Sequence, residues 1–199
     1  MEANCYVLID PDSRQALVID PGEEAQYIAE QLRLLHAVPC TILATHGHFD
    51  HILAAFELQM IFHIPFRLHE ADTFLVKRMR ESAEHFLGRA VVEPPPKVSA
   101  PLSDKEKITV GRYELTVCHT PGHTPGSVCF YAKKQHVIFV GDTIFSQGGV
   151  GRTDFSYSDA KKLNDSIRTI LSFPNNTIIY PGHGDETTVI QEKQYHSRI

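Results

Sequence analysis

Apolar residues near the start of the chain form short β-branched runs and then a stretch with helical spacing. The runs Cys5–Ile9 and Ala16–Ile19, with turn-forming residues at 10–13 between them, predict a β-hairpin. Apolar residues recur every three or four positions from Glu23 to Leu35, which predicts an amphipathic helix. Another short apolar run, Thr41–Ala44, is typical of a buried strand that ends at a loop.

Strand and helix signals continue through the rest of the chain. In the first half we expect helices at Ile52–Phe62 and Ala71–Phe86, a strand at Pro65–Leu68 and a proline-rich surface loop at Glu93–Pro101. In the second half we expect strands at Ile108–Val110, Tyr113–Val117, Val128–Tyr131, Val137–Val140 and Thr177–Tyr180, a glycine-rich loop at Ser146–Arg152, and a helix at Ser158–Leu171 with Ser158 as its N-cap. Each half consists of strands followed by helix, so we expect one α/β domain over residues 1–199.

Composition narrows the choice of partner. The net charge of −5 argues against a nucleic-acid surface, because proteins that bind polyanions carry a basic face. No apolar run approaches the length of a membrane span, and the first residues lack the basic and apolar regions of a secretion signal. The four cysteines have no C-x-x-C spacing and lie in or beside apolar runs, as buried thiols of a reducing compartment do. We therefore expect a cytoplasmic protein without nucleic-acid or membrane partners, and we assign it no oligomeric state.

Histidine is the informative residue type in this chain, which contains 12 of them. The stretch from His46 to His51 has the pattern H-x-H-x-D-H and directly follows the predicted strand Thr41–Ala44. Imidazole and carboxylate ligands together favour a transition metal over magnesium or calcium. His46 and His48 can share one ion at the end of an extended segment, while the Asp50–His51 pair turns toward a neighbouring ion. One loop can therefore begin two metal sites.

Three further motifs follow predicted strands, and each carries histidine or aspartate beside glycine or proline. They are T-P-G-H-T at 120–124, G-D-T at 141–143 and P-G-H-G at 181–184. Loops at the carboxyl ends of strands converge in α/β proteins, while the strands hold them rigid. We therefore expect these loops to meet the histidine loop in one metal centre.

The four motifs, in this order and over nearly the whole chain, resemble those of the metallo-beta-lactamase superfamily. Within it the chain is most similar to the glyoxalase II (hydroxyacylglutathione hydrolase) branch and related short hydrolases. The segments 19–22 (I-D-P-G) and 151–154 (G-R-T-D) are also similar, and the second is shared with persulfide dioxygenases of the same superfamily. The resemblance implies a four-layer αββα sandwich, whereas the strand and helix signals alone indicate only an α/β fold.

The resemblance also implies a dinuclear site with two divalent ions, expected to be Zn²⁺, with Fe or Mn as alternatives. An Asp that bridges two ions about 3.5–4 Å apart reduces their repulsion and leaves coordination positions open. Asp50 and Asp142 are accordingly implied to be catalytic residues as well as ligands. The implied ligands are His46, His48 and His123 for one ion and Asp50, His51 and His183 for the other, with Asp142 between the two.

Other residues are expected to support this centre. Asp20 either accepts a hydrogen bond from a ligand imidazole or caps its own loop, and we expect His119 to lie behind the ligands or to be structural. Arg152 lies about where the family has a basic contact to glutathione. It can pair with a substrate carboxylate or with Asp154 of its own chain.

The implied reaction is hydrolysis of a thioester, for which a glutathione conjugate is the family's substrate. Hydroxide held by the two ions would attack the thioester carbonyl. A thiolate can then leave without a general acid, whereas an amide nitrogen must be protonated, and the motifs contain no separate acid. After the last motif the chain has only the short segment 186–199, so we expect no C-terminal glutathione-binding helical domain.

Several alternatives share these motifs. A persulfide dioxygenase would hold one Fe(II) with His46 or its neighbour, His123 and Asp142. A lactonase or another esterase of the superfamily would use the dinuclear site. A beta-lactamase is disfavoured because one subclass has cysteine where Asp142 stands and is exported. A metal-binding module without catalysis is disfavoured because structural zinc sites are closed and usually cysteine-rich.

Overall fold

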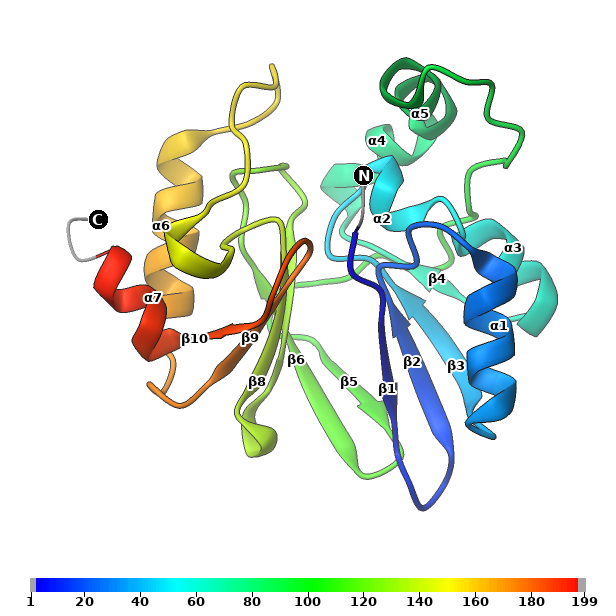
Figure 1. Cartoon of the computed structure of the whole chain (residues 1–199), viewed down its shortest axis with the longest axis horizontal. Coiled ribbons are helices and arrows are strands. Elements are labelled where there is room, and N and C mark those ends of the chain that lie inside the picture. The colour runs from blue at the N-terminus through cyan, green and yellow to red at the C-terminus, as the bar shows by residue number, and fades with distance from the viewer. Residues whose placement is uncertain (1–2, 197–199) are drawn as a thin grey trace.

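The computed structural model describes residues 3–196 and contains a four-stranded and a six-stranded sheet that pack face to face (Figure 1). The first sheet has the order β1-β2-β3-β4, with β1 at Tyr6–Ile9, β2 at Gln15–Ile19, β3 at Val38–Leu43 and β4 at Phe66–Arg67. The second has the order β10-β9-β8-β7-β6-β5, with β5 at Lys107–Val110, β6 at Tyr113–His119, β7 at Val128–Ala132, β8 at Val137–Gly141, β9 at Ile178–Pro181 and β10 at Thr187–Thr188.

Helices cover the outer face of each sheet. Helices α1 and α3 lie on the first sheet, and α6 and α7 lie on the second, which confirms the four-layer αββα sandwich (Figure 1). The α-helices are α1 at Ala25–Leu34, α2 at Phe49–Ile52, α3 at Ala55–Phe62, α4 at Thr73–Lys77, α5 at Met79–Leu87, α6 at Ala160–Leu171 and α7 at Val189–Tyr195. Short 3₁₀ helices lie at Glu70–Asp72 (η1), Lys133–Gln135 (η2) and Ser146–Gly148 (η3).

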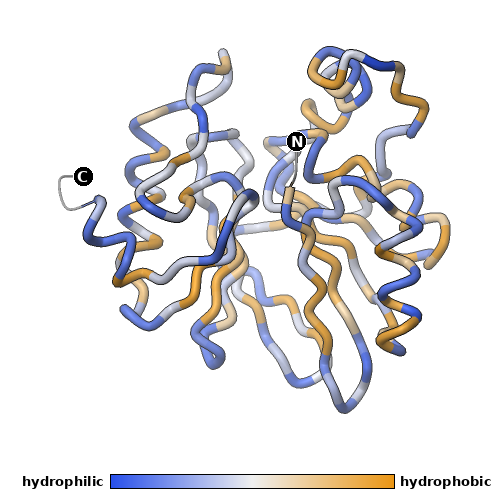
Figure 2. Tube along the Cα trace, viewed as in Figure 1, coloured by the Kyte–Doolittle hydropathy of each residue, from blue (hydrophilic) through white to orange (hydrophobic). Residues whose placement is uncertain are grey.

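The alternating side chains of the strands build separate apolar layers. On β2, Val18 packs with Leu32 of α1 in the cluster between the first sheet and its helices, whereas Leu17 faces the cluster between the sheets. On β7, Phe130 belongs to the layer between the sheets and Tyr131 to the layer under α6. Both sheets are therefore apolar on both faces, which Figure 2 shows as orange along the central strands.

Strand direction brings the motif-bearing loops to one edge of the sandwich. Strands β2 and β3 are parallel, and so are β8 and β9. Strand β7 is antiparallel to both β6 and β8, so β6 runs in the same direction as β8. The two sheets are joined at this edge because Val128 N donates to the Thr45 carbonyl at 2.8 Å.

Most predicted elements are present, and the differences have local causes. The stretch 71–86, predicted as one helix, is divided into η1, α4 and α5, with Arg78 at φ −97° and ψ 7° between the last two. The predicted N-cap Ser158 is wrong: Asp159 caps α6 by accepting from Lys162 N at 3.0 Å, while Ser158 Oγ donates to the His123 carbonyl. Strand β10 and helix α7 lie in a part of the chain for which the sequence predicts no element.

The cysteines and the helices of residues 3–196 bear on the expectations of free thiols and of no membrane span. All four cysteines are free; Cys129 is buried, and Cys5, Cys40 and Cys118 are partly buried. Among the helices in this range, none is both long and apolar enough to cross a membrane.

Candidate metal centre

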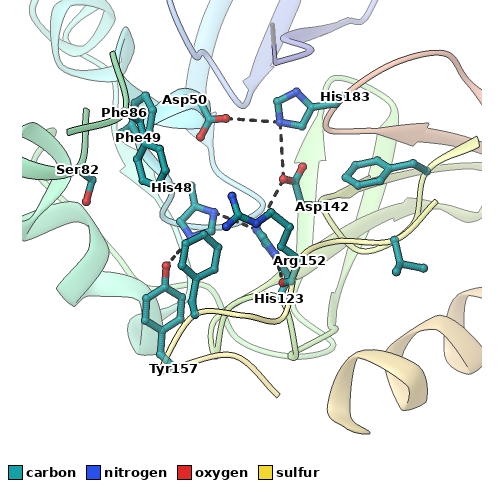
Figure 3. A pocket seen from close by; sticks show the side chains of 13 residues that line it. His48, Phe49, Asp50, Ser82, Phe86, His123, Asp142, Arg152, Tyr157 and His183 are labelled. Carbon is teal, nitrogen blue, oxygen red and sulfur yellow. Dashed lines mark hydrogen bonds and ion pairs between the residues drawn. The ribbon is translucent and has the colours of Figure 1, made fainter. Parts of the chain in front are cut away.

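The motif-bearing loops meet beside a cavity of about 360 Å³ (Figure 3). Asp50 comes from α2, His123 from the loop after β6, Asp142 from the loop after β8 and His183 from the loop after β9. The remaining walls are mainly aromatic. The lining consists of His48, Phe49, Asp50, Ser82, Phe86, His123, Asp142, Phe145, Val150, Arg152, Phe155, Tyr157 and His183.

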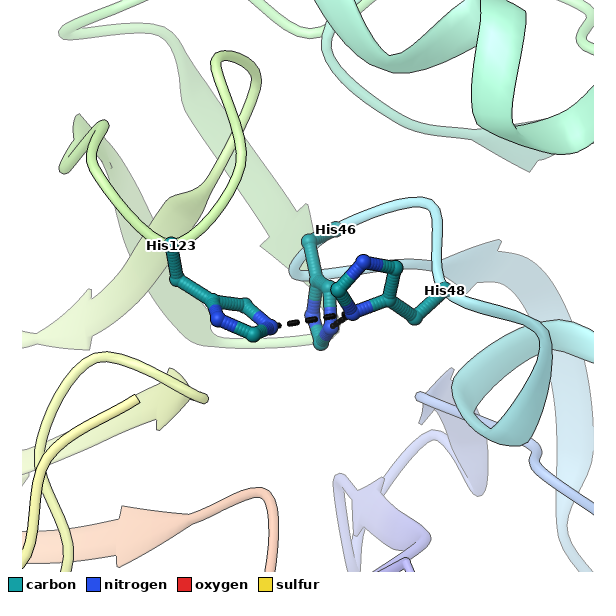
Figure 4. A group of neighbouring side chains, drawn as sticks. All are labelled: His46, His48 and His123. Carbon is teal, nitrogen blue, oxygen red and sulfur yellow. Dashed lines mark hydrogen bonds between the residues drawn. The ribbon is translucent and has the colours of Figure 1, made fainter. Parts of the chain in front are cut away.

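Three imidazole rings converge in a first donor group (Figure 4). His48 Nδ1 lies 3.1 Å from His46 Nε2 and 2.9 Å from His123 Nε2. These ring nitrogens all lie within 4.8 Å of one another, so a single ion could contact all three.

The outer nitrogens of two of these rings have polar partners that orient the rings. His123 Nδ1 donates to the Arg152 carbonyl at 2.8 Å, because a carbonyl can only accept. His48 Nε2 lies 2.8 Å from the Tyr157 hydroxyl. In the tautomer that carries its proton on Nε2, His48 donates to this hydroxyl and directs the lone pair of Nδ1 toward the centre. Both rings thus direct an unprotonated nitrogen toward the common point, as metal ligands do.

Asp20 lies beneath the centre and orients rings of both donor groups. Its Oδ1 accepts from Thr45 N at 2.7 Å, and its Oδ2 accepts from Thr45 Oγ1 at 2.6 Å and from His51 Nδ1 at 3.1 Å. Since Thr45 Oγ1 donates its proton to Asp20, it accepts from His46 Nδ1 at 3.1 Å. His46 and His51 therefore both direct Nε2 toward the centre.

A second donor group consists of Asp50, His51 and His183, whose ligand atoms also lie within 4.8 Å of one another. His183 Nε2 is 3.3 Å from His51 Nε2 and 3.5 Å from Asp50 Oδ2. Asp142 lies between the groups: its Oδ2 is 3.6 Å from both His123 Nε2 and His183 Nε2, and its Oδ1 is 3.4 Å from His51 Nε2.

Electrostatics at the centre favour cations. Burial, followed by the neighbouring His123, lowers the pKa of His48 to about 3, so this ring is neutral and can act as a ligand. Burial would raise the pKa of Asp142, but His51, His123 and His183 outweigh it and hold that pKa well below its ordinary value. Asp142 is therefore an ionised carboxylate whose side chain is 12% exposed, and its Oδ1 has no hydrogen-bond donor among the described residues. A divalent cation would satisfy this oxygen, so the donor set fits the implied metals.

Glycine at two positions lets the backbone lie close to the candidate ligands and to Thr45. A Cβ at Gly182 would lie 2.2 Å from Asp142 Oδ1 and 2.7 Å from His51 Cε1. A Cβ at Gly141, where φ is +53°, would lie 2.3 Å from Thr45 Oγ1. The glycines of the G-D-T and P-G-H-G motifs thus leave the space that the candidate ligands occupy.

Asp72 joins two of the loops that carry candidate ligands, a role that the sequence does not predict. Its Oδ2 accepts from Gly47 N at 2.9 Å and from Thr124 Oγ1 at 2.6 Å, and its Oδ1 accepts from Gly126 N at 2.6 Å. Asp72 is fully buried in a stretch predicted as a charged helix, and its sequence surroundings carry no signal for this role. Tyr157, whose role is likewise not predicted from the sequence, contacts His48 from the loop before α6.

Two predicted supporting residues lie farther from the donor atoms. The ring of His119 stacks on His69, with centroids 4.3 Å apart, and its Nε2 donates to the Pro125 carbonyl at 3.0 Å. It thus supports the loop that carries His123. Arg152 lines the cavity and forms a bidentate pair with Asp154, at 3.0 Å and 2.7 Å.

Known proteins resemble this chain over nearly its whole length. A family model described as the metallo-beta-lactamase superfamily matches residues 1–183. The hydroxyacylglutathione hydrolase GloC of Haemophilus influenzae is 36% identical over 201 residues, which cover 97% of this chain and 91% of GloC.

Two solved structures are similar along nearly the whole chain. The crystal structure of the BLEG-1 B3 metallo-beta-lactamase has a TM-score of 0.88 and 36% identity, and the match covers 96% of this chain and 91% of BLEG-1. TTHA1623, solved in a di-iron-bound form, has a TM-score of 0.85 and 33% identity, and the match covers 99% of this chain and 93% of TTHA1623.

Substitution of Gly182 should remove metal without unfolding the protein. In Gly182→Ala the new Cβ must displace Asp142 or His51, so we expect zinc-loaded protein to lose about half of its metal. Gly184→Ala is the matched control, because a Cβ there meets no atom within 4 Å and bears only the strain of φ +74°. Metal content is measured by atomic emission. Equal metal content in the two variants would contradict this account.

Asp72→Asn should destabilise the fold by about 2 kcal/mol, because the amide nitrogen must face an N–H or O–H donor in either orientation. The free energy of unfolding is measured by urea titration at neutral pH. Asp165→Asn removes an exposed pair with Arg168 on α6 and should cost less than about 0.5 kcal/mol. If both variants had the stability of the parent protein, Asp72 would not join the loops as described.

Proposed function

The chain belongs to the metallo-beta-lactamase superfamily, and on that premise we propose that it is a dinuclear metal-dependent hydrolase that cleaves thioesters of the hydroxyacylglutathione type. The position of Asp142 carries the proposal. Its Oδ2 is equidistant, at 3.6 Å, from a histidine of each donor group, as a carboxylate shared by two ions would be.

The residues of the two groups would hold the ions as the motifs imply: His46, His48 and His123 one, and Asp50, His51 and His183 the other, with Asp142 shared. Such ions, when bound, lower the pKa of a water molecule to near 7 and polarise a carbonyl. Zinc is the metal we propose first. The di-iron form of TTHA1623 makes iron its main competitor, and manganese is the third choice.

The cavity walls favour a leaving group that needs no proton. Among its described lining residues, the one phenol is Tyr157, and burial raises the pKa of Tyr157 to about 12. The carboxylates of the lining, Asp50 and Asp142, belong to the donor groups. A thiolate can leave such a site unprotonated, whereas an amine requires an acid, and this supports a thioester over an amide.

Glutathione as the thiol is supported by the likeness to GloC and by Arg152, the cation on the cavity wall. A substrate carboxylate would compete with Asp154 for the guanidinium of Arg152. The proposed partner is a small molecule, and the net charge of −5 argues against a nucleic-acid substrate.

Beta-lactam hydrolysis is the second candidate, and it rests on the likeness to BLEG-1. Its substrate would bring an amide nitrogen into a cavity whose carboxylates belong to the donor groups and whose phenol, Tyr157, is a weaker acid than usual. We therefore rank it below thioester hydrolysis.

The decisive assay is hydrolysis of S-lactoylglutathione, followed by the loss of thioester absorbance on zinc-loaded protein. The parent protein should turn the substrate over, and Asp142→Ala should lose metal together with at least about a thousandfold in kcat/KM. Asp165→Ala, an exposed change on α6, should retain both. A fully metallated and fully active Asp142→Ala variant would contradict the dinuclear site.

The same protein batch distinguishes the competitors. Negligible turnover of S-lactoylglutathione and of other glutathione thioesters by metallated protein would contradict the thioesterase proposal. Hydrolysis of nitrocefin would then favour the beta-lactamase, and oxygen consumption with glutathione persulfide by the iron form would favour the persulfide dioxygenase. Turnover of a lactone or simple ester would favour another esterase.

Arg152 and its partner can be tested with a pair of opposite changes. If Arg152 binds a substrate carboxylate, Arg152→Ala should raise KM for S-lactoylglutathione about tenfold, the value of a charge-assisted hydrogen bond. Asp154→Asn should lower KM, because it releases the guanidinium. Metal content should stay constant in both. An unchanged KM in both variants would contradict a role of Arg152 in substrate binding and would leave its ion pair with Asp154 as its only interaction of this kind.

A further inference from the structure

Two aromatic pairs form a wall of the cavity beside the metal centre, and of these rings the proposed hydrolysis uses only the Tyr157 hydroxyl, as a partner of His48. Phe49 of α2 stacks on Phe86 of α5, with centroids 5.9 Å apart and planes at 15°. Phe155 stacks on Tyr157 in the loop before α6, with centroids 5.3 Å apart and planes at 7° (Figure 3 labels Phe49, Phe86 and Tyr157). All four rings line the same cavity as the candidate ligands.

These rings lie next to the ligands that face the cavity. The Phe155 ring is 5.2 Å from the His48 ring, and the Tyr157 hydroxyl is 2.8 Å from His48 Nε2. Phe49 directly precedes Asp50 in α2. A group attached to the reacting carbonyl, within one or two bonds of it, would therefore meet aromatic faces.

The aromatic surface extends beyond the metal centre. A second cavity of about 430 Å³ shares Ser82, Phe86, Phe155 and Tyr157 with the first, so the two are adjacent between α5 and the 155–157 loop. Phe86 is 48% exposed, although solvent exposure of a large apolar ring is unfavourable. A bound apolar group would remove this ring from water.

The cations along this path already have partners. Arg152 is paired with Asp154, and its guanidinium lies over the Phe155 ring at 4.8 Å. Arg78, at the far end, is paired with Glu81 at 3.2 Å. An apolar group on the aromatic wall need not displace the carboxylate partner of either arginine, which favours flat apolar substrates.

We propose that the aromatic wall formed by Phe49, Phe86, Phe155 and Tyr157 binds an aryl group on the acyl side of the substrate. The preferred substrates are then aryl-substituted acyl thioesters rather than small aliphatic hydroxyacyl thioesters. This inference rests on the proposed thioesterase function and adds its substrate class. An aryl ring packed on these faces gains apolar burial together with offset or edge-to-face ring contacts.

A matched pair of substrates tests the proposal. S-mandeloylglutathione differs from S-lactoylglutathione only by phenyl in place of methyl, so the ratio of their kcat/KM values isolates the acyl side. For zinc-loaded parent protein we expect a ratio of about ten or more in favour of the mandeloyl thioester. Phe86→Ala and Phe155→Ala should lower the ratio toward one. Tyr27→Ala, at an exposed tyrosine of α1, is the control and should leave the ratio unchanged.

Binding of the two acids gives a readout that needs no turnover. Calorimetry on the zinc-loaded protein should show tighter binding of mandelate than of lactate, with the difference lost in Phe86→Ala. If both thioesters are hydrolysed and the ratio is one or lower, the inference is overturned while the thioesterase function stands. If neither thioester is hydrolysed, the thioesterase function fails and binding decides: tighter mandelate binding supports the aromatic wall, and equal binding overturns it.

Discussion

The metal centre depends on the buried carboxylate of Asp20. A carboxylate without water costs several kcal/mol unless donors surround it, and Asp20 has the backbone N–H and hydroxyl of Thr45 and the imidazole of His51. Through the Thr45 hydroxyl it also orients His46. A single side chain at the end of β2 therefore fixes one imidazole in each donor group, and the remaining candidate ligands are arranged around these two.

The sandwich makes this arrangement rigid. The loops that carry the candidate ligands leave the ends of strands in both sheets, and buried contacts such as those of Asp72 hold the loops to one another. Since strands held on both faces by apolar layers move little, the donor atoms are placed before any ion arrives. Preorganisation of this kind lowers the entropic cost of binding.

The sequence predicts the parts of the centre that local pattern determines. H-x-H-x-D-H and the three strand-end motifs place each candidate ligand on a loop next to a strand, and the structure brings all of these loops together. The position of each motif directly after a strand is enough to predict this, because the direction of the strands decides which loops lie at the same edge. The fold class likewise follows from the resemblance that these motifs carry.

What the sequence does not predict depends on contacts between distant segments. Asp72 interacts with Thr124, 52 positions away, and Tyr157 with His48, 109 positions away, so neither role has a local signal. The choice of Asp159 over Ser158 as N-cap has the same origin, because the Ser158 hydroxyl is engaged by the His123 carbonyl. The aromatic wall also joins α2 and α5 to a loop far along the chain.

The division of ligands between the two halves of the chain has a consequence for biosynthesis. His48 and His123 are 75 positions apart, and His51 and His183 are 132 positions apart, so each donor group is complete only when both sheets have formed and docked. A nascent chain that has emerged only as far as the proline-rich loop at 93–101 offers neither group in full. An ion that needs a complete donor group would therefore be bound only after both sheets have formed, and its binding free energy would then add to the stability of the sandwich.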